Sequence, residues 1–590
     1  MARSLFQPFR LILRGLLGGA LGAVVLTGAA QADGIGSSAS SFMVAAADER
    51  AVEAGLAALR AGGTAMDAAV AVQLVLNLVE PQNSGIGGGA FLLYYDAASG
   101  RTLSYDGRET APAAAGPDLF LTTDGEPMDF YAALVGGRAV GVPGTLRLLE
   151  QAHAAHGQRP WAELFEPAIA LAEAGFAISP KLARSISRAK ELDRYETTRR
   201  YFFSADGAAK PAGTILTNPE FAATLREIAD SGADAFYSGP IARDIVAAVQ
   251  GVPDNPGLMT EEDLAGYDAK PRSPVCGTYR IWTVCGMGPP TSGGLTVLQI
   301  MGLLEPFDLA ASGPGTLESV HLISEASRLA YADRGRYMAD SDFVQVPVTG
   351  LIDKAYLRER SALIQPDRVM IEVEAGVPPG ADARLAPDDR RMAAWALAPS
   401  PPPATESLTT THLSIVDGEG NAVAMTSSIE QAFGSRLMVR GFLLNQQLTD
   451  FSFQPTVGGE PVANRVESSK RPRSSMSPTL VFDVNGQFVM TLGSPGGPLI
   501  ISYVVETLIA SLDWGFAIQQ AISLPRHSNW RGPIAIEAGT PLAALEAPLE
   551  AMGHEVQLRD FHSNLQGIRS VQGGLEGGSD PRGEGVARGD

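Results

Sequence analysis

Three consecutive threonines, Thr409 to Thr411, open the segment whose residue types could support nucleophilic chemistry. An alternating apolar stretch to Val416, a Gly-Glu-Gly-Asn turn at 418–421 and a second apolar stretch at 422–429 follow, and together they predict a β-hairpin. A threonine hydroxyl is a weak nucleophile unless a base lies beside it, and the sequence shows no convincing His–Asp pair nearby. If the backbone were cut immediately before a threonine, the new α-amine, with a pKa of about 7.7–8.0, could take the hydroxyl proton.

Such a self-cleaving site needs a mobile segment before the threonine and a rigid strand after it. Residues 371–406 contain the runs Pro-Pro-Gly and Pro-Pro-Pro and are rich in Ala and Asp, a composition that is typical of a linker. The hairpin supplies the rigid strand. The same pattern also fits an ordinary threonine-rich strand start, so the residue types alone leave both interpretations open.

The elements that must position these threonines alternate between helix and strand, which indicates an α/β fold. Asp48 can cap a helix that runs to Arg60 and stops at Gly62. A second helix, from near Asp67 to Val79, is apolar nearly all round and should lie in the core. We further expect a strand at 90–95, helices at 144–153, 161–174, 219–229, 239–249, 295–304 and 316–332, and strand-rich segments at 411–453 and 479–492.

Other chemistries find little support in the motifs. Gly85 and Gly87 resemble part of a dinucleotide fingerprint, but they follow a helix and precede a strand, whereas that fingerprint needs the reverse order. His153 and His156 lie three apart on a helix without a third ligand nearby, so we expect a solvated helix surface rather than a metal site. The sequence therefore predicts neither a metal nor another cofactor.

Composition narrows the class of partner. The chain has 590 residues, with 45 basic and 65 acidic side chains and a net charge of −20. This balance argues against nucleic acid and against anionic membranes, since both need a basic surface, and favours a small solute. The two cysteines, Cys276 and Cys285, bracket a segment that reads as one strand, and Tyr279 to Ile281 are not typical turn residues, so we expect two unpaired thiols.

The first 32 residues have the features of a secretory signal peptide. Three arginines precede a short uncharged apolar run, and Ala30-Gln-Ala32 is a small-x-small cleavage pattern. The run is shorter than the roughly 20 residues that a membrane span needs. We therefore predict an exported protein without a membrane anchor after cleavage, most simply a periplasmic one.

Ordered motifs across nearly all of the mature chain resemble the γ-glutamyltransferase family, whose members are also called glutathione hydrolase proenzymes. The N-terminal motifs are Glu80-Pro-Gln-Asn-Ser-Gly-Ile-Gly-Gly-Gly89, Asp106-Gly-Arg-Glu-Thr-Ala-Pro112, Val140-Gly-Val-Pro-Gly144 and Pro289-Pro-Thr-Ser-Gly-Gly294. The C-terminal motifs are Thr410-Thr-His-Leu-Ser414, Leu443-Leu-Asn-Gln-Gln-Leu-Thr-Asp450, Lys470-Arg-Pro-Arg-Ser-Ser-Met-Ser-Pro478 and Gly493-Ser-Pro-Gly-Gly497.

The resemblance implies an N-terminal-nucleophile hydrolase with a four-layer αββα sandwich, made as one precursor that cuts itself. The T-x-H-x-S motif places the nucleophile at Thr410 and the cut between Thr409 and Thr410. Residues 33–409 would then form the large subunit and residues 410–590 the small subunit of a heterodimer. Gly496 and Gly497 would supply backbone N–H groups for the oxyanion, and Ser428 resembles the hydroxyl-bearing residue beside the nucleophile.

The same resemblance implies a site that binds the free α-amino and α-carboxylate groups of a γ-glutamyl compound such as glutathione. Water, an amino acid or a peptide would be the acceptor. Arg108 resembles the arginine that clamps the α-carboxylate, a planar anion that suits a guanidinium fork. Ser474 and Ser475 would donate hydroxyl protons to the same group. Asp450 and Gln447 resemble the acceptors for the α-ammonium group.

Some residues depart from the family pattern. Glu430 stands where many members have asparagine near the nucleophile and the α-carboxylate, and Pro498 follows the glycine pair where serine is common. The stretch 451–469 lacks a tyrosine and looks shorter than the lid loop of lidded members, so we expect an open cleft that favours hydrolysis over transfer. Two alternatives remain: a cephalosporin or glutaryl acylase on the same fold, and a non-catalytic exported binding protein.

Overall fold

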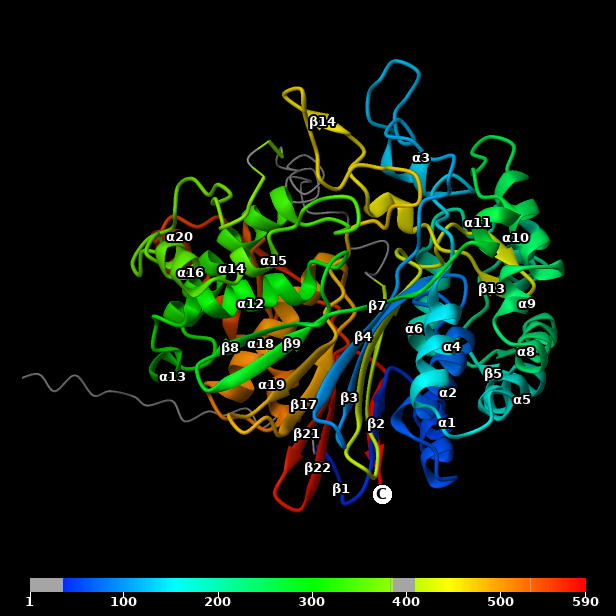
Figure 1. Cartoon of the computed structure of the whole chain (residues 1–590), viewed down its shortest axis with the longest axis horizontal. Coiled ribbons are helices and arrows are strands. Elements are labelled where there is room, and N and C mark those ends of the chain that lie inside the picture. The colour runs from blue at the N-terminus through cyan, green and yellow to red at the C-terminus, as the bar shows by residue number, and fades with distance from the viewer. Residues whose placement is uncertain (1–35, 383, 386–408, 531) are drawn as a thin grey trace, which may run out of the picture. The chain divides into compact units, whose positions relative to one another are not determined.

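Two seven-stranded antiparallel sheets form the centre of the computed structural model, which describes residues 36–382, 384–385, 409–530 and 532–590 (Figure 1). The predicted signal peptide at 1–32 and residues 386–406 of the predicted linker lie outside the described residues. The first sheet has the order β1 (Ser37–Ala39), β22 (Gly574–Ser579), β21 (Gln566–Val571), β17 (Phe488–Gly493), β16 (Thr479–Phe482), β9 (Trp282–Gly286) and β8 (Val275–Tyr279). The second has the order β23 (Val586–Gly589), β2 (Met43–Ala46), β10 (Thr411–Val416), β11 (Ala422–Ser428), β3 (Gly89–Asp96), β4 (Arg101–Gly107) and β7 (Lys270–Arg272).

The central strands are buried on both faces, and successive side chains serve two different cores. In β11, Val423 and Met425 pack toward helices on the outer face of the second sheet, whereas Ala422 and Ala424 pack into the layer between the two sheets. Because side chains alternate across a strand, one apolar run can fill both cores. This accounts for the nearly continuous apolar sequence at 422–425.

Helices cover the outer face of each sheet, so the layers run helix, sheet, sheet, helix (Figure 1). Helices α1 (Glu49–Arg60) and α2 (Ala65–Val79) lie on the second sheet, with α4 (Thr145–His156), η1 (Trp161–Phe165) and α5 (Glu166–Ala174) packed beside α2. Helices α12 (Gly293–Leu304) and α18 (Ile500–Leu512) lie on the first sheet, and α14 (Leu317–Tyr337) and α16 (Lys354–Ser361) pack on α12. The αββα expectation is therefore confirmed.

The predicted helices are present, and their starts follow from local capping. Asp48 accepts a hydrogen bond from the Arg50 N–H and begins α1. Helix α2 begins two residues earlier than expected, because Thr64 and Asp67 form a reciprocal capping box. The other helices within the described residues are α3 (Phe130–Leu134), α6 (Pro180–Arg188), α7 (Glu196–Phe202), α8 (Pro219–Ser231), α9 (Asp234–Tyr237), α10 (Pro240–Gln250), α11 (Glu261–Ala265), α13 (Leu309–Ser312), α15 (Val348–Leu351), α19 (Ile518–Ser523), α20 (Glu546–Ala551), η2 (Gln447–Asp450), η3 (Gly497–Leu499) and η4 (Pro541–Leu545).

Short strands account for the rest of the described secondary structure, and one pair lies in the stretch 451–469, where a reduced lid is expected. Strands β14 (Thr456–Val457) and β15 (Glu460–Pro461) form a small hairpin around Gly458 and Gly459, both with positive φ. Its effect on the cleft stays a prediction. The other short strands are β5 (Phe176–Ala177), β6 (Ile215–Leu216), β12 (Met438–Val439), β13 (Phe442–Leu443), β18 (His527–Ser528), β19 (Ile534–Glu537) and β20 (Val556–Arg559).

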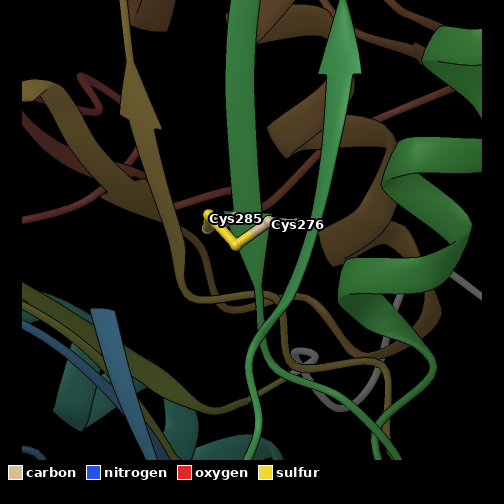
Figure 2. Close-up of a disulfide and its surroundings, with 2 residues drawn as sticks. All are labelled: Cys276 and Cys285. Atoms are coloured by element: carbon tan, nitrogen blue, oxygen red, sulfur yellow. A yellow bond between two sulfur atoms is a disulfide. The ribbon is translucent and has the colours of Figure 1, made fainter. Parts of the chain in front are cut away.

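The expectation of two unpaired thiols is wrong, because Cys276 and Cys285 form a disulfide (Figure 2). The bracketed segment is a hairpin rather than one strand: β8 and β9 pair antiparallel, and the two cysteines are direct register partners with Cα atoms 4.1 Å apart. The chain reverses at Arg280, whose φ of +51° is unusual for a residue other than glycine. Turn composition gave no sign of this conformation.

The two helical histidines are packed rather than solvated, so that expectation is also wrong. The His156 ring stacks on Tyr94 with centroids 4.0 Å apart and hydrogen-bonds the Tyr105 hydroxyl. His153 lies 3.1 Å from the Asp67 carboxylate. Both side chains fill the interface between α4 and the elements beneath it. Among the described residues, no cluster of His, Cys, Asp and Glu could hold a metal ion.

No helix within the described ranges is both long enough and apolar enough to cross a membrane.

Candidate active site

The β10–β11 hairpin places Thr410 opposite the end of its partner strand. The register pairs Thr411 with Ser427, so the preceding Thr410 lies beside Ser428. Their hydroxyl oxygens are 3.1 Å apart, and Thr410 is only 4% exposed. The φ angle of Thr410 is +105°, a strained value for a β-branched residue, as is often found at functional sites.

The residues on both sides of the Thr409–Thr410 bond are held by the segment from Ser428 to Glu430. The Thr409 hydroxyl donates to the main-chain carbonyl of Glu430. The Glu430 N–H donates in turn to the Ser428 hydroxyl oxygen at 2.9 Å. Glu430 itself has a φ of +78°, so this segment turns sharply past the hairpin end. The predicted cleavage bond is therefore fixed by contacts on each side.

His412 shares the strand face of Thr410 but does not serve it as a base. Its ring nitrogens lie 2.8 Å from the Thr426 hydroxyl and 3.1 Å from the Ser414 hydroxyl. Complete burial lowers the pKa of His412 to about 3, so the ring is neutral under working conditions. The T-x-H-x-S pattern therefore packs β10 against the first sheet, and no side-chain base at Thr410 comes from it.

Strand β17 brings the Gly496–Gly497 segment toward the same end of β10. A Cβ atom on Gly493, the last residue of β17, would lie 2.4 Å from the His412 ring, so the two strands cross in close contact there. Gly496 and Gly497 follow within four residues, with φ angles of +136° and +54°. In the described part of the chain, neither of their amide N–H groups donates to a protein acceptor. These amides are therefore available to an oxyanion.

Arg108 follows β4 and is completely buried, yet it joins two separate loops. Its Nη2 atom lies 2.5 Å from the Asp450 carboxylate, and its Nε and Nη2 groups donate to the main-chain carbonyls of Pro472 and Arg473. Within the described residues, Nη1 makes no hydrogen bond. It faces the Glu109 carboxyl at 3.6 Å. Burial raises the pKa of Glu109 to about 8, so this group is largely protonated at neutral pH.

Gln447 connects the acidic side chains of the site. Its amide nitrogen donates to the Glu430 carboxylate at 3.0 Å and to the Asp450 carboxylate at 2.9 Å. The short helix η2 supplies both Gln447 and Asp450, and the Asp450 side chain is 23% exposed. Two carboxylates thus line one edge of the site, which suits a cationic group of a ligand.

Ser474 and Ser475 lie on the loop that also holds Arg108. The Ser474 hydroxyl oxygen accepts from the Met476 N–H at 3.1 Å. The Ser475 hydroxyl oxygen accepts from the Arg334 guanidinium at 2.7 Å, and Ser475 remains partly exposed. Each hydroxyl keeps its own proton for another acceptor, so the pair suits an anionic group of a ligand.

Hydrogen bonds link the sequence-predicted residues into two groups. Thr410 and Ser428 form the first group, and Glu430 joins it to the second. The glycine pair reaches the site through strand packing rather than through hydrogen bonds. The second group contains Gln447, Asp450, Arg108 and the loop that carries Ser474 and Ser475.

Sequence reasoning missed three buried polar residues at the site: Glu109, Ser292 and Arg334. Glu109 and Ser292 lie inside motifs that carry the family resemblance, so their position in those motifs was an available signal. Arg334 lies in α14, where a single arginine on a helix reads as surface.

Comparison with known proteins agrees with these motifs. A family model described as gamma-glutamyltranspeptidase matches residues 51–589. Glutathione hydrolase proenzyme of Bacillus subtilis (strain 168) is 40% identical over 517 residues, which cover 87% of this chain and 85% of the relative. The enzyme of the same name from Escherichia coli (strain K12) is 37% identical, covering 92% of this chain and 90% of the relative.

Solved structures agree with the fold and the family. Cephalosporin acylase from Bacillus halodurans superimposes with a TM-score of 0.79 at 26% identity, covering 94% of this chain and 96% of that one. Gamma-glutamyltranspeptidase from Helicobacter pylori has a TM-score of 0.54 at 38% identity, covering 57% of this chain and 95% of that one. The family match over residues 51–589 and the two relatives establish that this chain belongs to the gamma-glutamyltranspeptidase family.

Proposed function

We propose that this chain is a self-processing γ-glutamyltransferase and glutathione hydrolase whose nucleophile is Thr410. The observation that carries the proposal is the placement of the Thr410 hydroxyl, 3.1 Å from that of Ser428 and joined through Glu430 to the Arg108–Asp450 pair. A candidate nucleophile thus lies beside a charged cluster of side chains that offers both donors and acceptors. The family membership, with relatives named glutathione hydrolase proenzyme, supports the same chemistry.

Maturation begins when the Thr410 hydroxyl attacks the carbonyl carbon of Thr409. The C–N bond breaks, the hydroxyl proton passes to the departing nitrogen, and Thr409 becomes esterified to the Thr410 oxygen. Water then hydrolyses this ester, leaving Thr409 as a carboxyl terminus and Thr410 with a free α-amine. The positive φ of Thr410 and the contacts on both sides of the bond favour this rearrangement by holding the reacting atoms together.

Turnover uses the new α-amine as the base. It accepts the hydroxyl proton of Thr410 while the oxygen attacks the γ-carbonyl carbon of a γ-glutamyl compound. The N–H groups of Gly496 and Gly497 stabilise the oxyanion, and the departing amine takes up the proton. Water attacking the acyl-enzyme releases glutamate, whereas an amino acid or peptide amine forms a new γ-glutamyl bond.

Recognition of a free glutamyl head follows from the two charged edges of the site. Arg108 and the hydroxyl protons of Ser474 and Ser475 would bind the α-carboxylate. The carboxylate of Asp450 and the side-chain carbonyl of Gln447 would bind the α-ammonium group. The amide nitrogen of Gln447 already donates to the Glu430 and Asp450 carboxylates. Its side-chain oxygen has no hydrogen-bond partner among the described residues and remains available to the ammonium group.

The two predicted subunits would stay together after cleavage because their strands interleave. In the second sheet, β10 and β11 of the 410–590 segment lie between β2 and β3 of the 33–409 segment. Separating them would break hydrogen-bonded strand pairs on two sides. A heterodimer is therefore the expected mature form, exported and most simply periplasmic.

The acylase alternative differs in one chemical group, since a glutaryl chain lacks the α-ammonium. Replacing Asp450→Asn should lower kcat/KM for γ-glutamyl-p-nitroanilide by roughly tenfold to a hundredfold and leave glutaryl-p-nitroanilide nearly unchanged. The exposed Asp193→Asn variant is a matched control that should affect neither substrate. A wild-type preference for the glutaryl compound would favour the acylase.

A denaturing gel tests the binding-protein alternative. The wild type should give two fragments and hydrolyse γ-glutamyl-p-nitroanilide, whereas Thr410→Ala should remain one chain without turnover. A wild-type chain that stays whole and inactive would favour the binding protein.

A further inference from the structure

Arg334 bridges two loops that meet at the predicted α-carboxylate site. It lies on α14, within the 33–409 segment, and is 4% exposed. Its Nε group donates to the Ser292 hydroxyl oxygen at 2.7 Å, and its Nη2 group donates to the Ser475 hydroxyl oxygen at 2.7 Å. One planar guanidinium thus holds a serine on each loop in a fixed relative position.

The two loops are also joined by their main chains. The Ser292 N–H and hydroxyl both donate to the Ser474 carbonyl, at 2.9 and 2.6 Å. The Ser474 N–H donates to the Pro290 carbonyl at 3.2 Å. Ser292 therefore fixes the Ser474 main chain while it anchors Arg334, and the serine pair cannot turn independently of α14.

The contact with Arg334 also decides what Ser475 can do. A guanidinium has donors and no acceptor, so the Ser475 oxygen must accept from it and cannot donate to it. Within the described part of the chain, no protein acceptor takes the Ser475 hydroxyl proton. A cationic donor also polarises the O–H bond and makes that proton a stronger donor. Ser475 is therefore oriented to donate its proton to a carboxylate and is a poor partner for an ammonium group.

We propose that Arg334 is a positioning residue that acts through Ser475 to set the affinity of the site for the substrate α-carboxylate. The inference rests on the proposed function, because the proposed function assigns the substrate α-carboxylate to Ser474 and Ser475. Arg334 does not touch the substrate. It makes the serine pair dependent on the 33–409 segment, since the donor lies in one predicted subunit and the serine in the other.

The test compares Arg334→Met and Arg334→Lys in matured protein, with γ-glutamyl-p-nitroanilide as substrate. Arg334→Met should raise KM tenfold or more and change kcat less than about threefold. Arg334→Lys should be intermediate, because an ammonium keeps the charge but cannot span both serines. Arg328→Met, a neighbouring arginine of α14 that pairs with Glu325, is the control and should leave KM unchanged.

A double-mutant cycle separates this role from a general structural one. Added to Ser475→Ala, the Arg334→Met change should alter kcat/KM less than about threefold, because the residue through which it acts is gone. The inference would be overturned if Arg334→Met lowered kcat/KM by the same factor with and without Ser475→Ala, or if its effect fell on kcat alone. If Arg334→Met does not mature, Arg334→Lys replaces it in the same cycle: a raised KM whose increase disappears in the Ser475→Ala background supports the role, and a KM equal to that of the wild type contradicts it. A wild type that releases no nitroaniline would instead refute the proposed function.

Discussion

The hydroxyl oxygen of Thr410 lies 3.1 Å from that of Ser428, across the open end of the β10–β11 hairpin. The Ser428 oxygen also accepts the Glu430 N–H, so it is held in place beside the nucleophile. This relationship predicts that Ser428 orients the Thr410 hydroxyl in both maturation and turnover.

Replacing Ser428→Ala should slow both self-cleavage and kcat by roughly tenfold to a hundredfold, the expected cost of one hydrogen bond to a reacting group. Gel densitometry over time gives the first rate and nitroaniline release gives the second. Ser427→Ala is the matched control, because its hydroxyl points to the opposite strand face and donates to Gln73. Unchanged rates in Ser428→Ala would contradict the role.

The glycine pair predicts a steric and electrostatic requirement at Gly496. Its φ is +136°, and a Cβ atom there would lie 2.7 Å from the Tyr503 ring. Gly496→Ala should therefore displace the amide donors and lower kcat by about a hundredfold. Gly486→Ala provides the comparison, since Gly486 has a φ of +75° but open space around it, and its cost should be limited to stability. Equal kcat values for the two variants would exclude an oxyanion role for Gly496.

Most helices could be predicted because periodicity and capping are local signals. The apolar pattern of α12 and the N-cap of α1 each involve residues that are close together in the sequence. The site residues came from motifs rather than from periodicity. Strand pairing brings together segments as distant as Arg108 and Asp450, and no local pattern specifies which strands pair.

The features that sequence analysis missed depend on tertiary context. The disulfide joins the strands of a hairpin that reverses at Arg280, whose positive φ its residue type does not suggest. Arg334 reads as a surface residue of α14, and only the packing of two loops reveals its partners. The prediction of a solvated surface for His153 and His156 is wrong for the same reason, since the rings of Trp161 and Tyr94 pack against them.

Buried Glu506 predicts a pH dependence of stability. Burial raises its pKa to about 8, although Arg526 acts in the opposite direction. Between about pH 4.3, the ordinary glutamate value, and pH 8, the folded state binds more protons than the unfolded state, so stability falls as the pH rises. The stabilisation that protonated Glu506 provides is complete below about pH 4.3 and is lost above about pH 8.

Thermal unfolding between pH 5 and 8 measures this effect. The Tm of the wild type should fall across the range, and Glu506→Gln should show a smaller fall, because glutamine does not titrate. The two proteins should differ least at pH 5. Parallel curves for wild type and variant would show that Glu506 is not the titrating group.

The disulfide predicts that the chain has no thiol free to react. Under denaturing conditions without reductant, iodoacetamide should leave the mass unchanged, and after reduction it should add two labels. Cys276→Ser combined with Cys285→Ser should lower stability by up to about 3 kcal/mol, since the closed loop is short. Labelling before reduction would show that the thiols are unpaired in the protein.

The amino terminus of the small fragment tests the central claim most directly. Edman sequencing or intact mass of the fragment should show that it begins Thr-Thr-His at residue 410, with the large fragment ending at Thr409. A fragment that begins at any other residue, or a catalytically active chain that remains uncut, would contradict the assignment of Thr410 as nucleophile and of its α-amine as base.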